Sequence, residues 1–229
     1  MKQLITIVLF VSIVALPLLA QPELEIVEPK FEFGYLPQHC TVSHYFWFKS
    51  VGDDTLVIND INTGCVCALV NLDKNRLAPG DSTLVGISWE IKNSLYNAAR
   101  HPKISTNARP KPYYLELKGV ILKSMDSLSP LSSSPYKLEL TRYKEKSINE
   151  IEFELKNIAD KEIEIFEMSY PIEECEITLP AKIPANSSAK GFIKVKPEYL
   201  DKEFMRSLTI AVAGFYKKRI TIPIRRKFY

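Results

Sequence analysis

The stretch Thr41-Val-Ser-His-Tyr-Phe-Trp-Phe48 alternates between apolar and more polar side chains, and it decides the fold class. Successive side chains of an extended strand point to opposite faces. Val42, Phe46 and Phe48 therefore share one face, and the residues between them share the other. Aromatic and β-branched residues with this two-residue period are typical of a strand that has one face in a hydrophobic core.

Similar runs follow at a spacing of about ten residues, which is typical of β-sandwich proteins. They predict further strands at Leu56–Ile61, Ser82–Glu90, Lys103–Thr106 and Tyr113–Leu122. Sequences rich in Gly, Pro and Asp separate several of these runs and favour turns. A short helical interruption is expected only around residues 93–99. The chain is therefore predicted to be all-β, with an immunoglobulin-like sandwich as its basic unit.

The second half of the chain repeats the pattern of the first roughly a hundred residues later, which indicates a duplicated domain. Phe46-Trp-Phe48 corresponds to Phe153-Glu-Leu155, and Leu77-Ala-Pro-Gly80 corresponds to Ile183-Pro-Ala-Asn186. Between the halves, residues 124–134 are rich in serine and proline and show no apolar period, which is typical of a linker. We therefore expect two tandem immunoglobulin-like β-sandwich domains, at residues 22–123 and 135–229.

The first twenty residues have the order of a secretory signal peptide. A basic start, Met1-Lys2-Gln3, precedes an apolar run that ends in the small residue Ala20. The alternative is an uncleaved membrane anchor, but Pro17 interrupts the run near its end. We expect cleavage near Ala20, export to the periplasm or cell envelope, and no stable membrane insertion afterwards.

The small net charge of the chain excludes nucleic acid from the expected partners. The chain carries 30 Lys and Arg against 27 Asp and Glu, a formal net charge of +3, which gives no strong field for nucleic acid. The basic runs Lys217-Lys-Arg219 and Arg225-Arg-Lys227 are interpreted as a solvated final strand. We expect the partner to be another protein of the envelope and not a nucleic acid.

The cysteines are the strongest candidates for chemistry. Cys65 and Cys67 are two residues apart, so on a strand both thiols face the same side, and Cys40 and His44 share a face by the same rule. Such soft ligands suit Cu(I) or Zn(II). The alternative is a disulfide between Cys40 and one of the pair, and both interpretations stay open. Cys175 is expected to be buried.

No catalytic constellation is recognisable. The sequence lacks Gly-x-Ser-x-Gly and glycine-rich phosphate-binding motifs, and it contains three histidines and eight glycines. The alternating Glu150, Glu152 and Glu154 are interpreted as a solvated strand face. We predict a protein that is not an enzyme and that needs no cofactor, apart from the copper or zinc considered above.

Tyr45 and Trp47 lie on the face opposite Phe46 and Phe48, so one or both are candidates for a contact surface that docks a polypeptide or a sugar. The alternative is that a neighbouring domain covers them. The preferred function is an adaptor or scaffold, followed by a metal or thiol function of Cys65 and Cys67, and then carbohydrate binding.

The first half of the chain contains, in order, the motifs Phe31-Glu-Phe-Gly34, His44-Tyr-Phe-Trp-Phe-Lys-Ser-Val-Gly52, Gly64-Cys-Val-Cys-Ala68, Pro79-Gly-Asp81 and Thr106-Asn107. In these motifs it resembles a family of exported β-sandwich proteins that is common in Bacteroidetes and catalogued as a domain of unknown function. The family is similar to ASH (Hydin-like), major-sperm-protein and PapD-like domains, of which PapD-like proteins act by strand addition. The resemblance implies the fold and the compartment, but no activity.

The chain departs from the family pattern at two places. Gly64 and Val66 replace a small hydroxyl residue before the cysteine pair and the glycine between the cysteines, and Ser50 stands where asparagine is usual.

Overall fold

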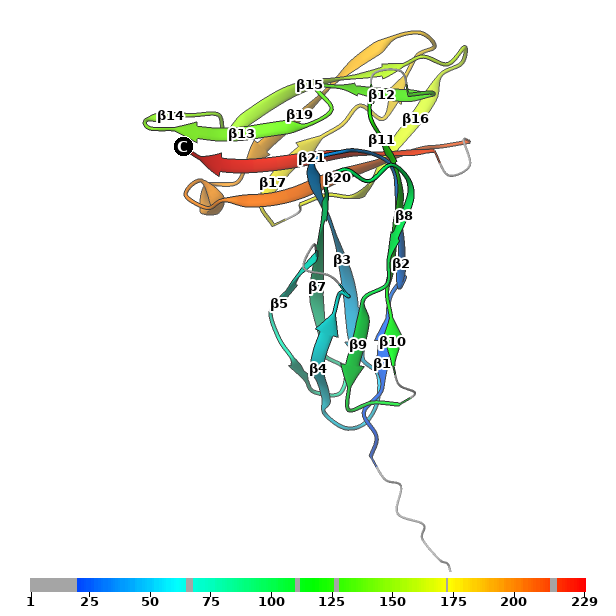
Figure 1. Cartoon of the computed structure of the whole chain (residues 1–229), viewed down its shortest axis with the longest axis vertical. Helices are drawn as coiled ribbons and strands as arrows, with labels where there is room; N and C mark the ends of the chain where they lie inside the picture. Colours follow the sequence, from blue (N-terminus) through cyan, green and yellow to red (C-terminus); the bar gives the residue numbers. More distant parts are fainter. Residues whose placement is uncertain (1–19, 65–67, 110–111, 126–127, 172, 215–217) are drawn as a thin grey trace, which may run out of the picture.

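The computed structural model describes residues 20–64, 68–109, 112–125, 128–171, 173–214 and 218–229. Their regular structure is β-strand, apart from one short 3-10 helix, η1 (Pro197–Tyr199). None of the described segments forms a helix with the length and apolar character needed to cross a bilayer. Figure 1 shows two lobes, one of which lies across the end of the other.

We call the lobe built from the first half of the chain the N-lobe. Its sheet β1-β3-β7-β5 packs against the strands of a second layer, which are ordered β10-β9-β4-β6 and β8-β11-β2. The strands of the N-lobe are β1 (Leu24–Ile26), β2 (Lys30–Pro37), β3 (Cys40–Ser50), β4 (Leu56–Asn62), β5 (Ala68–Leu72), β6 (Arg76–Leu77), β7 (Ser82–Ile91), β8 (Tyr96–Arg100), β9 (Lys103–Thr106), β10 (Tyr113–Tyr114) and β11 (Glu116–Leu122).

We call the second lobe the C-lobe. Its sheet β12-β15-β19-β17 faces a layer ordered β18-β16-β20-β21, to which β13 is added by parallel pairing with β21. The strands of the C-lobe are β12 (Leu131–Ser134), β13 (Leu138–Tyr143), β14 (Lys146–Ser147), β15 (Glu150–Asn157), β16 (Ile163–Ser169), β17 (Cys175–Thr178), β18 (Lys182–Ile183), β19 (Ser188–Val195), β20 (Phe204–Val212) and β21 (Arg219–Phe228).

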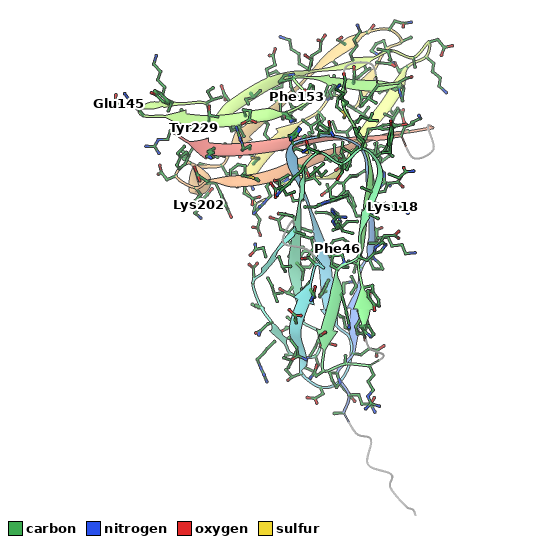
Figure 2. All side chains as sticks on the ribbon, viewed as in Figure 1. Phe46, Lys118, Glu145, Phe153, Lys202 and Tyr229 are labelled. Atoms are coloured by element: carbon green, nitrogen blue, oxygen red, sulfur yellow. The ribbon has the colours of Figure 1, made fainter. Side chains whose placement is uncertain are left out.

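Each lobe has its own hydrophobic core, made by the inward positions of its strands. Figure 2 shows Phe46 inside the N-lobe and Phe153 inside the C-lobe. The alternation predicted for β3 is confirmed, because Val42, Phe46 and Phe48 are buried whereas Trp47 is 48% exposed. The prediction of an all-β immunoglobulin-type sandwich is confirmed by this architecture.

Two local expectations are wrong. Residues 96–100 form strand β8 and not a helical turn, because their backbone pairs antiparallel with β11. The last part of the expected linker, Leu131–Ser134, forms strand β12, which pairs antiparallel with β15. Serine-rich sequence suggested an unstructured segment there, but Leu131 enters the core and the segment gains backbone hydrogen bonds from β15.

The lobes share one continuous sheet. Strand β21 of the C-lobe pairs parallel with β2 of the N-lobe at a single position, Tyr35 opposite Ile220. This pairing joins β2, β11 and β8 of the N-lobe to the second layer of the C-lobe in a sheet of nine strands, while β10-β9-β4-β6 stays a separate sheet. Met168 of the C-lobe also packs against the N-lobe core. The junction is therefore made by backbone, polar and apolar contacts together.

Candidate functional site

The junction between the lobes begins at a free edge of β3. Strand β1 pairs only with the C-terminal part of β3, at residues 48–50, and leaves the preceding part without a strand on that side. Ser207 of β20 takes that place: its Oγ accepts a hydrogen bond from Ser43 N and donates one to Ser43 O, both 3.0 Å long. One buried hydroxyl thus satisfies both backbone groups of Ser43, which would be costly to bury without partners.

A second hydroxyl chain joins β20 and β21 to β2. Thr221 Oγ1 donates to Phe33 O over 2.6 Å, and Thr209 Oγ1 lies 2.8 Å from Thr221 Oγ1. All three residues are fully buried. Next to them Gly34 adopts a φ of +72°, and a Cβ at this position would collide with the carbonyl oxygen of Arg219. The backbones of the lobes therefore approach so closely here that only glycine fits.

A charged pair occupies the side of the junction next to β3. Arg206 Nε donates to Glu174 Oε1 over 2.6 Å, and Tyr45 OH donates to the same oxygen over 3.3 Å. Glu174 is 1% exposed. Burial raises the pKa of Tyr45 to about 12, so its hydroxyl stays protonated at neutral pH. The C-lobe thus partly covers Tyr45, one of the two expected contact residues.

His44 lies in the same region and is held on several sides. Its ring stacks on Phe31 with a centroid distance of 3.6 Å and meets Phe46 edge-on, while its Nδ1 lies 2.9 Å from Ser169 Oγ. Burial, together with the charge of Arg219, lowers the pKa of His44 to about 3. The imidazole is therefore neutral, and one of its two nitrogens is already bonded within the junction.

Cys40 is a free thiol whose Sγ donates to Pro37 O over 3.1 Å. Burial raises its pKa to about 12, so it carries no thiolate at neutral pH. Cys65 and Cys67 lie outside the described residues, and within the described ranges no three His, Cys, Asp or Glu side chains form a metal-binding group. The predicted copper or zinc site stays a prediction. Cys175 is buried and free.

Trp47 differs from these junction residues because its ring faces solvent on the outer face of the sheet β1-β3-β7-β5, with 48% of its surface exposed. Leu84 is its cross-strand neighbour on β7, and the ion pair between Lys49 and Glu25, 3.9 Å apart, comes from strands of the same sheet. The structure therefore separates the two expected contact residues: Tyr45 belongs to the junction, whereas Trp47 faces solvent.

The corresponding face of the C-lobe is highly charged. Glu150, Glu152 and Glu154 alternate along β15 opposite β19, and Lys190 Nζ lies 2.7 Å from Glu152 Oε1. This is the solvated face that the sequence predicts.

The final strand differs from expectation, because Arg226 is 1% exposed and donates to Leu200 O and Asn149 Oδ1. The expectation of a fully solvated basic strand is therefore wrong at this residue.

Sequence reasoning did not identify Glu174, Arg206, Ser207 and Thr221 as junction residues. One signal was available in β20 and β21. Along both strands, most even-numbered residues are large and aliphatic. Several odd-numbered residues are Ser, Thr or Ala, and most of these small residues are buried. Small hydroxyl residues opposite an apolar face indicate a strand covered on both sides, with a polar contact on the second side.

Comparison of the sequence with known protein families finds one family that matches part of the chain. The family described as "Protein of unknown function (DUF1573)" matches residues 24–121, and the resemblance predicted for the N-lobe is thereby confirmed. Among curated proteins there is no match.

Solved structures resemble the chain only in fold. A protein of unknown function from Porphyromonas gingivalis W83 has 10% identity and a TM-score of 0.36, covering 89% of this chain and 98% of its own. PapD-like domain 7 of human CEP192 has 9% identity and a TM-score of 0.36, covering 53% and 99%. The chaperone DraB of E. coli has 9% identity and a TM-score of 0.34, covering 90% and 98%. Such scores support no functional inference.

Proposed function

We propose that this protein is a non-catalytic scaffold or adaptor of the bacterial cell envelope, exported through the leader expected at residues 1–20. Its two lobes are held by the junction in one relative orientation, and it binds another envelope protein through the outer face of β1-β3-β7-β5. The observation that carries the proposal is the contrast between Trp47, half exposed on that face, and Tyr45, which is bonded to the C-lobe. Large aromatic side chains at the centre of an interface contribute much of the binding energy.

The state of the ionisable groups at the junction supports a non-catalytic role. His44 is neutral and bonded to Ser169, Glu174 is paired with Arg206, and the thiol of Cys40 is protonated. An acid, base or nucleophile must reach its substrate and be able to change its protonation state near the working pH. These groups instead bond to neighbouring side chains or to the backbone, which suits a structural role.

The face that we assign to the partner can be tested with a matched pair of positions. Phe192 lies on the corresponding sheet of the C-lobe and is 47% exposed, nearly the same as Trp47. A photo-crosslinking amino acid placed at position 47, in cells that export the protein, should give a crosslink to one defined envelope protein. The same amino acid at position 192 should not give this crosslink.

Binding to the purified partner then tests the contribution of the side chain. Trp47→Ser should weaken the affinity by about thirtyfold, the typical loss at a central interface tryptophan, whereas Phe192→Ser should leave it within about twofold. Circular dichroism of both variants checks that the fold is retained. Equal losses for the two variants, or equal crosslinking from the two positions, would contradict the assignment of this face.

A further inference from the structure

A cavity of about 270 Å³ lies between the lobes, at the end of β3 where the chain turns from β2. Since one water molecule occupies about 30 Å³ in the liquid, the cavity has room for about nine waters or for one small molecule. Side chains of both lobes line it, so it exists only when the lobes are joined. Ile91, Ile224 and Pro223 lie behind this lining but are buried, so the apolar surface that the cavity presents comes mainly from Met205, which is 45% exposed, and from the half-buried Cys40.

The charges around this cavity do not balance. Lys92, Lys137 and Arg225 line it together with two carboxylates, Glu90 and Glu139. Both carboxylates already have a cation: Lys92 Nζ lies 3.6 Å from Glu90 Oε2, and Arg225 Nε donates to Glu139 Oε2 over 2.7 Å. The remaining positive charge is that of Lys137.

The ammonium of Lys137 is held in place without being neutralised. Its Nζ donates to Gln38 O over 2.8 Å and to His39 O over 3.0 Å, and neither carbonyl carries a net charge. Among the described residues no carboxylate forms an ion pair with it. An ammonium has three N–H donors, so one remains for a further acceptor. The neighbouring Cys40 thiol is protonated and supplies no compensating charge.

These features define the chemistry of a ligand. A partly buried, uncompensated ammonium favours an anion, because a charged acceptor gives it a stronger hydrogen bond than a neutral acceptor does. A single excess charge matches a singly charged head group, whereas a phosphate dianion would leave a net negative charge to be buried. The side chain of Met205 and the thiol of Cys40 offer a small apolar surface to a compact aliphatic body behind that head group.

We propose that the cavity between the lobes binds a small monocarboxylate with an aliphatic body, whose carboxylate accepts a hydrogen bond from Lys137. The ligand contacts both lobes, and its binding therefore stabilises their joined arrangement. This site is separate from the face around Trp47, so the proposal does not depend on the scaffold function.

Three probes that share one six-carbon chain test the charge preference on the unaltered protein: hexanoate, hexanol and hexylammonium. Isothermal titration calorimetry at pH 7 and low salt should show hexanoate binding at least tenfold more tightly than hexanol, and no binding of hexylammonium. Chemical shifts of the amides at Ile91 and Ile224 should move with hexanoate and locate the site. Equal affinities for the three probes, or no binding of hexanoate at millimolar concentration, would overturn the proposal.

Two substitutions test the role of Lys137 itself. Lys137→Met keeps an unbranched apolar side chain, one atom shorter, and removes the ammonium. It should lower hexanoate affinity at least tenfold, whereas Lys137→Arg should retain most of it. Lys92→Met is the matched control, because Lys92 lines the same cavity but is already paired with Glu90. Unchanged hexanoate affinity in folded Lys137→Met, or equal losses for Lys92→Met and Lys137→Met, would contradict a direct contact. If Lys137→Met fails to fold, the comparison of the three probes on the unaltered protein still decides the outcome.

Discussion

At the residue scale, Asn157 and Ser50 occupy equivalent strand ends in the two lobes but are bonded differently. Asn157 Nδ2 donates to Lys161 O and Ile183 O over 2.8 and 3.0 Å, and its Oδ1 accepts from Ala159 N over 2.9 Å. The side chain thereby ties the β15–β16 turn to the start of the β18–β19 turn. Ser50 is equally buried, yet its Oγ has no hydrogen-bond partner among the described residues.

This difference predicts opposite effects of two substitutions. Asn157→Ala removes several bonds and leaves buried carbonyls unpaired, so we expect a loss of about 3 kcal/mol in the free energy of unfolding. Ser50→Asn places at the equivalent strand end of the N-lobe the residue type that is well bonded in the C-lobe, so we expect a gain of about 1 kcal/mol. Urea denaturation of both variants measures these changes. A destabilised Ser50→Asn protein would show that the two turns are not equivalent.

His44 predicts an acid sensitivity at the same scale. A histidine in the unfolded chain titrates near pH 6.5, whereas burial holds the pKa of His44 at about 3 in the folded protein. The unfolded state therefore binds more protons between these values, and stability falls as the pH drops from 6.5 towards 3. Between pH 7 and pH 4 this residue should account for a loss of about 3 kcal/mol.

The comparison with His44→Phe isolates this effect, because phenylalanine can still stack on Phe31 but does not titrate. Urea denaturation at pH 7, 5 and 4 should show a smaller acid loss for the variant than for the unaltered protein. Parallel losses in the two proteins would exclude His44 as the source.

The metal hypothesis for Cys65 and Cys67 predicts a result that needs no assay of function. If these thiols bind copper or zinc, the mature protein carries metal at purification and Cys65→Ser/Cys67→Ser does not, while its fold is retained. Metal analysis combined with thiol counting distinguishes this case from a disulfide. Absence of metal together with fewer than four free thiols would end the ligand hypothesis.

At the element scale, strands could be predicted from sequence where one face of the strand is buried and the other is exposed to solvent. The range predicted for β9 agrees with the structure, and β3, β4 and β7 differ only by a residue or two at their ends. Prediction failed for β8 and β12, whose small or polar residues carry little signal and whose pairing depends on distant strands. The hydroxyl residues of β20 and β21 indicate a covered second face, but their partners could not be foreseen, because the bonds join residues more than a hundred positions apart.

Gly34 tests how much the close contact between β2 and β21 contributes. In Gly34→Ala the new Cβ would meet the backbone of Arg219 in addition to the strain of a positive φ, so we expect a loss of about 3 to 4 kcal/mol. Gly80→Ala is the control, because Gly80 also has a positive φ but an added Cβ there would meet no atom within 4 Å, and it should lose about 1 kcal/mol. Thermal unfolding of both variants gives the comparison. Equal losses would mean that the junction tolerates the extra methyl group.

At the scale of the whole molecule, two β-sandwich lobes act as one body only if the polar junction holds them. The contacts of Ser207, Thr221 and Glu174 are buried and join opposite lobes, so separating the lobes would expose several hydrogen-bonding groups and the shared edge of β2 and β21. Domains of one chain usually move relative to one another unless their interface is extensive. We expect these lobes to stay joined because separation would leave buried hydrogen-bonding groups without partners. The scaffold proposal and the cavity both depend on this rigidity.

Residual dipolar couplings of backbone amides, measured on weakly aligned, isotope-labelled mature protein, test the rigidity most directly. We predict that couplings from the two lobes fit a single alignment tensor with the lobes in the orientation of Figure 1. Two tensors of different magnitude, one for each lobe, would show that the lobes move independently and would contradict the account.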